Sequence, residues 1–205
     1  LFTIWGIEMN LQSGKYYWPT TFPDAPSYPA LEEDLYCDVL IIGGGSSGAQ
    51  CAYELADTNL DVVVIEKLTI GSGSTSANTA LLQYSGEKMF INLVNTFGED
   101  YMARHLQLLK DAVDTIEAAS KNVAIDCEFT RRDTLYGASC PEDVEKLRKE
   151  YEYLKSHNCE LDFLSKEEVE AKYPFSRDAA IYSYNDAEIN QFRYTHALID
   201  KKKKK

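Results

Sequence analysis

The chain has 205 residues, 44% hydrophobic and 26% charged, a composition typical of a globular protein with one or two domains. Its 33 acidic residues outnumber 21 basic ones, for a formal net charge of -12 at pH 7. Nucleic acid and anionic membrane surfaces are bound by clustered Lys and Arg, so both are poor candidates for partners of this chain. The sequence contains no run of 18 apolar residues, and we expect no membrane span.

The cysteine pattern argues against a metal centre. Five cysteines are scattered along the chain without a CxxC pair or a Cys/His cluster, so we expect no metal site. The first eight residues lack the basic region of a signal peptide, and we expect Met9 to be the natural start. An odd cysteine count without a leader favours a reducing compartment, and we expect a cytoplasmic protein. The cysteines are Cys37, Cys51, Cys127, Cys140 and Cys159.

The N-terminal segment, residues 1–36, is rich in proline and aromatic residues. Four prolines fall between residues 19 and 29, a density that disfavours regular helix and central strand. We therefore predict an extended arm. The interleaved aromatic side chains indicate that this arm lies on the body of the protein.

The next segment carries the clearest structural pattern. Cys37–Ile42 is a short apolar run typical of a buried parallel strand, and Asp61–Glu66 is a second, β-branched run. Gly43–Gly48 and a helix at Ala49–Asp57 connect them. This order and spacing predict a βαβ unit, and hence an α/β fold with a parallel sheet.

The glycine run Gly43–Gly48 has the GxGxxG pattern in the context that dinucleotide binding requires. The first glycine permits a tight turn, Gly45 lets the backbone approach a pyrophosphate, and Gly48 lets helix and strand pack closely. The helix N-terminus offers N–H groups and the positive end of its dipole to the phosphates. Glu66 ends the second strand, where its carboxylate can accept both ribose hydroxyls and would repel a 2′-phosphate.

The rest of the chain alternates helical and strand patterns. The longest helix, Glu99–Ser120, carries an apolar stripe at three- and four-residue steps, as expected for packing on a sheet. Ser165 and Glu168 form a capping-box pattern for a short helix. The other expected elements are a helix at 87–95, two strand pieces within 126–139, a helix at 141–156, a strand at 179–184 and a helix at 192–200.

Three segments together resemble a known family: CDVLIIGGGSSGAQCAYEL (37–55), DVVVIEK (61–67) and GSGSTSANTALLQY (71–84). They are similar to FAD-dependent oxidoreductases of the D-amino-acid oxidase, glycine oxidase and sarcosine oxidase type. The resemblance implies a three-layer, Rossmann-like FAD-binding domain and an α+β substrate domain. We accordingly expect an FAD domain at 37–120, a partial substrate domain at 121–184, and a return segment with a lysine tail at 185–205.

The resemblance also implies which residues contact FAD. Ser74–Ser76 would donate to phosphate or ribityl oxygens, and Lys67 would flank the adenosine. The residues that would approach the isoalloxazine are Asn78, Thr79, Leu81 and Leu82. The complete expected set is Gly43, Gly45, Ser46, Ser47, Gly48, Glu66, Lys67, Ser74, Thr75, Ser76, Asn78, Thr79, Leu81 and Leu82.

The implied activity is oxidation of an amine or amino acid by hydride transfer to flavin N5, with oxygen or another acceptor reoxidising the flavin. One alternative is a dehydrogenase of the same superfamily that acts on a hydroxy substrate such as glycerol 3-phosphate. Another is a non-catalytic nucleotide-binding module, for which the aromatic residues at 16–28 would be an interaction surface. The sequence leaves the substrate, the acceptor, covalent flavin attachment and oligomeric state open.

No catalytic or substrate-binding residue can be assigned from the sequence. Arg131 and Arg132 could bind a substrate carboxylate, but a strand pair with solvated or ion-paired arginines is the favoured interpretation. His105, His157 and His196 are isolated on predicted helices, and we expect none to be catalytic.

Members of the resembled family are much longer than this chain. We therefore expect Lys201–Lys205 to mark a truncation, an artefact or an added tail. The resemblance implies that much of the substrate pocket is missing and that the fragment is inactive.

Overall fold

The structure, a computed structural model, describes residues 2–4, 7–9, 14–86 and 88–201. Contacts within the chain group residues 1–78 and 191–205 in a first unit and residues 79–190 in a second. The boundary near residue 79 differs from the expected boundary at residue 120, because the long helix packs among elements of the second unit.

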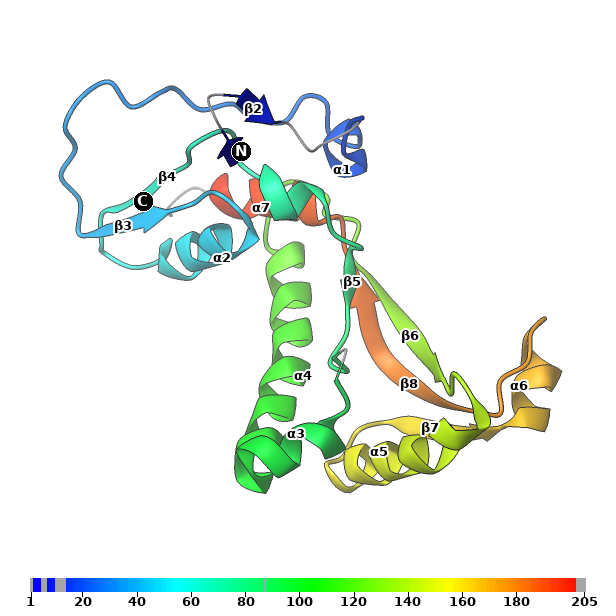
Figure 1. Cartoon of the computed structure of the whole chain (residues 1–205). Helices are drawn as coiled ribbons and strands as arrows, with labels where there is room; N and C mark the ends of the chain where they lie inside the picture. The colour runs from blue at the N-terminus through cyan, green and yellow to red at the C-terminus, as the bar shows by residue number, and fades with distance from the viewer. Residues whose placement is uncertain (1, 5–6, 10–13, 87, 202–205) are drawn as a thin grey trace. The chain divides into compact units, whose positions relative to one another are not determined.

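The first unit is built on a parallel strand pair. Strand β3 (Val39–Ile42) lies beside β4 (Val62–Ile65) in parallel register, and helix α2 (Ser46–Leu55) connects them (Figure 1). This is the predicted βαβ unit. Helix α2 begins at Ser46 rather than at Ala49, so the two serines of the glycine run form part of the first helical turn.

A short 3-10 helix and a C-terminal helix complete this part of the fold. The 3-10 helix η1 (Gly73–Ser76) lies in the expected Ser/Thr loop, and α7 (Gln191–Ile199) packs on α2. The Tyr194 hydroxyl donates a 2.8 Å hydrogen bond to Gln50 Oε1 across this helix pair. The expected lysine tail beyond Lys201 lies outside the described residues.

The N-terminal arm contains more regular structure than expected. Strands β1 (Phe2–Ile4) and β2 (Ile7–Met9) pair antiparallel, and α1 (Tyr17–Thr20) is one helical turn. The prediction of an extended arm is therefore wrong for α1, whereas β1 and β2 are extended strands. Pro19 is compatible with α1 because a helix of one turn leaves its first N–H groups without intrahelical partners, so the missing proline N–H costs little.

The second unit contains an antiparallel sheet with β8 (Ala179–Glu188) at its centre. Strand β6 (Thr130–Gly137) pairs along one edge of β8, while β5 (Leu81–Leu82) and β7 (Leu161–Ser165) pair with the two ends of the other edge. The two strand pieces expected within 126–139 are one strand, whose register shifts between residues 132 and 134. Strands β5 and β7 were not anticipated.

Helices pack against one another and the sheet to form the core of the second unit. Helix α3 (Phe90–Phe97) contacts both α4 (Glu99–Lys121) and α5 (Val144–Ser156), and α5 contacts β7 and β8 (Figure 1). Helix α3 corresponds to the one expected at 87–95, whose first expected residue, 87, lies outside the described residues. The buried core includes Phe90, Met102, Leu106, Leu147, Leu154, Leu161 and Ile181.

Two local predictions in this unit are confirmed. Met102, Leu106 and Val113 of the α4 stripe are buried, as the three- and four-residue spacing predicted. Helix α6 (Lys166–Lys172) begins with the expected capping box, in which Ser165 and Glu168 each satisfy the other's backbone N–H. Within the described ranges no helix is both long enough and apolar enough to cross a membrane.

Candidate cofactor-binding site

The turn between β3 and α2 depends on two glycines. Gly43 has φ +113°, which L side chains rarely adopt, and its N–H donates to Ile65 O at 2.7 Å. A Cβ on Gly48 would lie 1.9 Å from Gly43 O, so helix and turn can approach this closely only with glycine at position 48. Both glycines therefore have the backbone roles that the motif predicted.

Glu66 closes this turn from the end of β4. Its Oε2 accepts the Gly44 N–H at 2.7 Å, and its Oε1 accepts the Leu68 N–H at 3.0 Å. The Gly44 bond is the main cause that lowers the pKa of Glu66, and the Leu68 bond adds to it. Each carboxylate oxygen has two lone pairs, so this arrangement leaves capacity for ribose hydroxyls.

The Ser/Thr loop meets the first turn of α2. Ser46 N–H donates to Thr75 Oγ1 at 3.1 Å, and the buried Ser76 hydroxyl donates to Gly71 O at 2.6 Å. These two hydroxyls, expected to face the cofactor, therefore also organise the loop. Ser74 is exposed at the start of the same loop.

A cavity of about 370 Å³ opens at the carboxyl ends of β3 and β4. Apart from Gly43 and its two chain neighbours, no atom lies within 4 Å of the position that a Cβ on Gly43 would occupy, so the backbone there is accessible to a ligand. The N-terminus of α2, the permissive glycines and the Glu66 carboxylate are the features that hold a dinucleotide, and the residues present fit FAD. The lining residues are Ile42, Gly43, Ile65, Glu66 and Lys67.

The expected contact residues divide between the two units. Thr79, Leu81 and Leu82 belong to the second unit, where Leu81 and Leu82 form β5 and pair with residues 187–188 of β8. All other expected residues, from Gly43 to Asn78, fall in the first unit.

Sequence reasoning missed Gly44 and Trp18. A Cβ on Gly44 would lie 2.3 Å from Ile70 Cδ1, the end of a flexible side chain, and 3.1 Å from Glu66 Cβ, so a side chain there would require Ile70 to shift. The three-glycine run could have indicated this crowding. Trp18 Nε1 donates to Asn78 O at 2.8 Å. The aromatic residues of the arm predicted that the arm packs on the rest of the protein, but they did not identify Trp18 as the residue that makes this contact.

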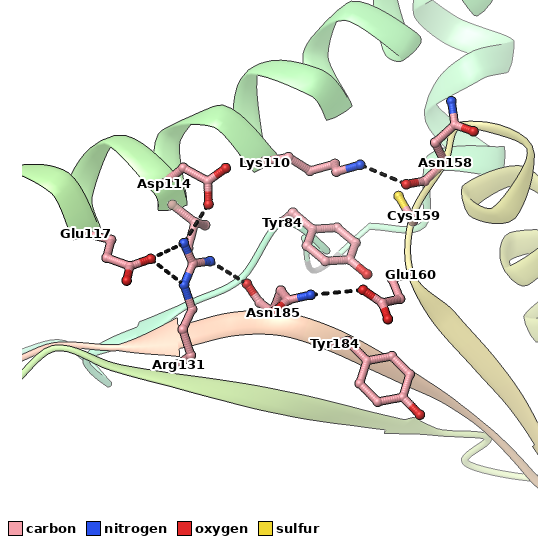
Figure 2. A pocket seen from close by; sticks show the side chains of 11 residues that line it. Tyr84, Lys110, Asp114, Glu117, Arg131, Asn158, Cys159, Glu160, Tyr184 and Asn185 are labelled. Atoms are coloured by element: carbon pink, nitrogen blue, oxygen red, sulfur yellow. Dashed lines mark hydrogen bonds and ion pairs between the residues drawn. The ribbon is translucent and has the colours of Figure 1, made fainter.

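The second unit has its own cavity, of about 430 Å³, between α4 and the sheet (Figure 2). Figure 2 shows Arg131 pointing towards Glu117 and Asp114 of α4; Arg131 Nε donates to Glu117 at 2.8 Å and Nη1 donates to Asn185 O at 2.8 Å. Arg132 pairs with Glu188 at 2.7 Å. Both arginines are ion-paired, in agreement with the interpretation that they are structural residues rather than ligands of a substrate carboxylate.

Among the described residues, no group of three or more His, Cys, Asp or Glu side chains is placed so that it could hold a metal ion. All five cysteines are free thiols. Burial lowers the pKa of His196, whose ring packs between Phe22 and Phe192.

Comparison with known proteins identifies the class to which this fold and site belong. Residues 38–204 match the DAO family, described as FAD dependent oxidoreductase. The chain belongs to this family of FAD-dependent oxidoreductases, which confirms the resemblance read from the glycine run and the Ser/Thr loop.

Two curated relatives cover nearly all of the chain. One is "Putative Rieske 2Fe-2S iron-sulfur protein YhfW" of Bacillus subtilis (strain 168), 30% identical over 90% of this chain and 35% of its own length. The other is gamma-glutamylputrescine oxidoreductase of Escherichia coli (strain K12), 26% identical over 94% of this chain and 41% of its own length. The chain thus spans well under half of either relative.

Among solved structures, glycine oxidase from Bacillus cereus ATCC 14579 is similar with a TM-score of 0.59 and 21% sequence identity. The match covers 80% of this chain and 42% of the oxidase. It supports the predicted α/β fold class with a parallel sheet in the FAD-binding part.

Proposed function

We propose that this chain forms the FAD-binding part of an oxidoreductase that oxidises an amine or amino acid. The observation that carries the proposal is the β3–α2–β4 turn, where Glu66 and the N-terminus of α2 flank an open cavity. FAD binding follows from the site's chemistry, while the substrate class draws on the similarity to other proteins.

Each part of the site has a role towards FAD. Glu66 accepts the adenosine ribose hydroxyls, the first turn of α2 donates N–H groups to the pyrophosphate, and Gly45 lets the phosphates approach the backbone. Lys67 flanks the adenosine at the same cavity. Bound FAD supplies the electron-accepting chemistry that no protein side chain provides.

The remaining loop residues extend this binding surface. Ser74 and Asn78 are exposed in this loop, and Thr75 aligns the Ser46 N–H at the turn.

Two similarities support an amine or amino-acid substrate. The Escherichia coli relative is named for gamma-glutamylputrescine, which carries an amino group, and the similar solved structure is a glycine oxidase. The described residues supply no side chain that we assign to substrate oxidation, so the substrate class is proposed from these similarities alone.

The name of the Bacillus subtilis relative favours a specific electron acceptor. That protein is named for a Rieske 2Fe-2S centre, and it covers 90% of this chain. We propose an iron–sulfur centre as a second candidate acceptor besides oxygen. Slow reoxidation of the photoreduced, FAD-loaded chain in air would argue against oxygen as the acceptor, and faster reoxidation by an added Rieske 2Fe-2S protein than by air would support the iron–sulfur centre. Reoxidation in air as fast as that of free reduced flavin would argue for oxygen.

The substrate class can be tested by anaerobic reduction of the bound flavin. The FAD-loaded product of the full reading frame would be mixed with gamma-glutamylputrescine, glycine or sn-glycerol 3-phosphate, and the loss of yellow absorbance followed. We expect bleaching by an amine. If only glycerol 3-phosphate bleaches the flavin, the proposal is contradicted and the alternative of a dehydrogenase for a hydroxy substrate is supported.

A further inference from the structure

The N-terminal arm is tied directly to the loop that we propose to hold FAD. Trp18 Nε1, in α1, donates to the main-chain oxygen of Asn78 at 2.8 Å. The Asn78 side chain in turn donates to Thr75 O at 2.8 Å, and Thr75 Oγ1 accepts the Ser46 N–H at 3.1 Å. A chain of three hydrogen bonds therefore connects the arm to the first turn of α2.

The same arm is anchored to α7 by a second set of contacts. Arg193 donates to Thr21 O, at 3.0 Å from Nη2 and 3.3 Å from Nε, and its guanidinium lies over the Phe22 ring at 5.4 Å. Phe22 also meets the His196 ring edge-on, with 5.9 Å between centroids. The segment from Trp18 to Phe22 is thus held on the body from both of its ends.

The other end of the loop rests on α7. A Cβ built on Gly71 would lie 2.9 Å from the Phe192 ring, so this ring packs directly on the start of the loop. Phe192 also packs against His196, at 4.7 Å between ring centroids. The loop from Gly71 to Asn78 is consequently restrained at both ends by contacts that include the arm.

We propose that Trp18 is a positioning residue that fixes the Ser/Thr loop, and through Thr75 the pyrophosphate-binding turn, in its ligand-ready conformation. The consequence for FAD rests on the proposed function, while the effect on the loop itself does not. The arm is then an internal part of the cofactor site. For Trp18 and Phe22 this assignment replaces the alternative of a surface for another protein, whereas Tyr17 and Tyr28 of the arm are 67% and 48% exposed.

Preorganisation gives the contact its functional value. A loop that is already held in the binding conformation loses less conformational entropy when the ligand binds, so an ordering contact raises affinity without touching the ligand. One net hydrogen bond corresponds to about a two- to tenfold change in an equilibrium constant. We therefore expect effects of that size when the indole N–H is removed.

The test compares Trp18→Phe, which keeps a ring and removes the N–H donor, with Tyr17→Phe as the matched control. Tyr17 is the neighbouring aromatic residue of α1 and is 67% exposed. Hydrogen–deuterium exchange on the apo chain measures the loop directly, and fluorescence titration with FAD measures affinity. Arg193→Met, which removes the second anchor, provides an independent variant.

In Trp18→Phe we expect amides 71–78 to exchange about two- to tenfold faster and the Kd for FAD to rise by a similar factor. Amides of β3 and β4 should keep wild-type protection, which separates loosening of the loop from general unfolding. Arg193→Met should also loosen the loop, and Tyr17→Phe should match the wild type. If Trp18→Phe unfolds, Arg193→Met decides by the same criteria.

Wild-type exchange in residues 71–78 of Trp18→Phe, or of Arg193→Met where the first variant unfolds, would overturn the proposal. The exchange measurement needs no FAD, so it decides the role of the arm even if the wild-type chain binds none. Failure of the wild type to bind FAD would instead contradict the proposed function. Faster exchange with unchanged FAD affinity would reject the role of the arm in cofactor binding.

Discussion

The backbone N–H of Gly44 donates a 2.7 Å hydrogen bond to the carboxylate of Glu66, 22 residues further along the chain. This contact joins the glycine turn after β3 to the end of β4. A residue expected to bind the ribose therefore also shapes the turn that would receive the pyrophosphate. Loss of its charge should weaken both functions together.

The substitution Glu66→Gln tests this double role. It removes the charge that two backbone N–H groups stabilise, and charge-assisted hydrogen bonds are about twice as strong as neutral ones. We expect the Kd for FAD to rise at least about tenfold, corresponding to about 1.4 kcal/mol. Fluorescence titration checks this result, and wild-type affinity in the variant would contradict the assignment of Glu66 to the adenosine ribose.

The pH dependence of unfolding provides a separate check on Glu66. Its pKa in the fold lies below the ordinary value of 4.5, so its stabilisation is present above pH 4.5 and is lost as pH falls through the lowered pKa. The stability difference between wild type and Glu66→Gln should shrink in that acid range. A difference that stays constant down to the lowest accessible pH would contradict the hydrogen bonding described.

Gly48→Ala should damage the site by overpacking. The added Cβ would meet Gly43 O at 1.9 Å, and backbone atoms cannot rotate away as a flexible side chain can. We expect destabilisation of about 1–3 kcal/mol and a loss of FAD binding. Gly86→Ala is the control, because no atom lies within 4 Å of its added Cβ; equal behaviour of the two variants would refute the close approach.

Arg131 should matter for stability rather than for cofactor binding. Its guanidinium bridges α4 and β8 through Glu117, Asp114 and the carbonyl of Asn185. Arg131→Met should lower the free energy of unfolding by about 1.5–3 kcal/mol, the range for hydrogen bonds to charged groups. Arg132→Met, which removes an exposed ion pair, should have little effect in the same urea titration.

A substrate-binding role for Arg131 would produce a different pattern. In that case Arg131→Met would keep wild-type stability and would weaken binding of a carboxylate ligand. Measurement of both properties on the same preparation distinguishes the two roles.

Glu150 is a buried carboxylate with a structural task. It accepts the N–H groups of Phe90 at 2.8 Å and Ile91 at 3.0 Å, and so satisfies the N-terminus of α3 from α5. Burial raises its pKa above 4.5 despite these bonds. An acid with a raised folded pKa binds protons more readily in the fold, so its contribution to stability is greatest below pH 4.5 and falls as pH rises through the folded pKa.

Glu150→Gln should remove this pH dependence. As pH is lowered from neutral towards 4.5, wild type should gain stability relative to the variant in thermal unfolding. Glu152→Gln, on the exposed side of the same helix, should follow the wild-type curve. A wild-type curve parallel to that of Glu150→Gln across this range would show that the pKa is not raised.

Much of the first unit could be predicted because its signals are local. The apolar runs predicted the positions of β3 and β4, and the glycines at 43 and 48 and the acidic residue at 66 predicted the turn between them. The expected burial of β3 is wrong, because Leu40 and Ile42 are 50% and 79% exposed. The capping box at Ser165 and the apolar stripe of α4 could also be predicted from the sequence, since both depend on residues three or four positions apart.

The features that were missed depend on contacts between distant residues. Strand β5 has two residues and pairs with β8 more than a hundred positions away, so no periodicity could reveal it. The hydrogen bond from Trp18 to Asn78 likewise crosses 60 positions. The sequence analysis expected a domain boundary at residue 120, whereas contacts divide the chain near residue 79. The amphipathic stripe of α4 shows that this helix packs on something, but it does not show which elements it packs against.

The visible absorption spectrum of the purified chain after incubation with FAD, followed by acid precipitation, tests the central claim most directly. We predict a yellow protein that carries FAD and releases it into the acid supernatant, as expected for a non-covalent dinucleotide site at Glu66 and the glycine turn. A folded chain that stays colourless after FAD is added, with β3, α2 and β4 protected from exchange, would contradict the assignment of this site.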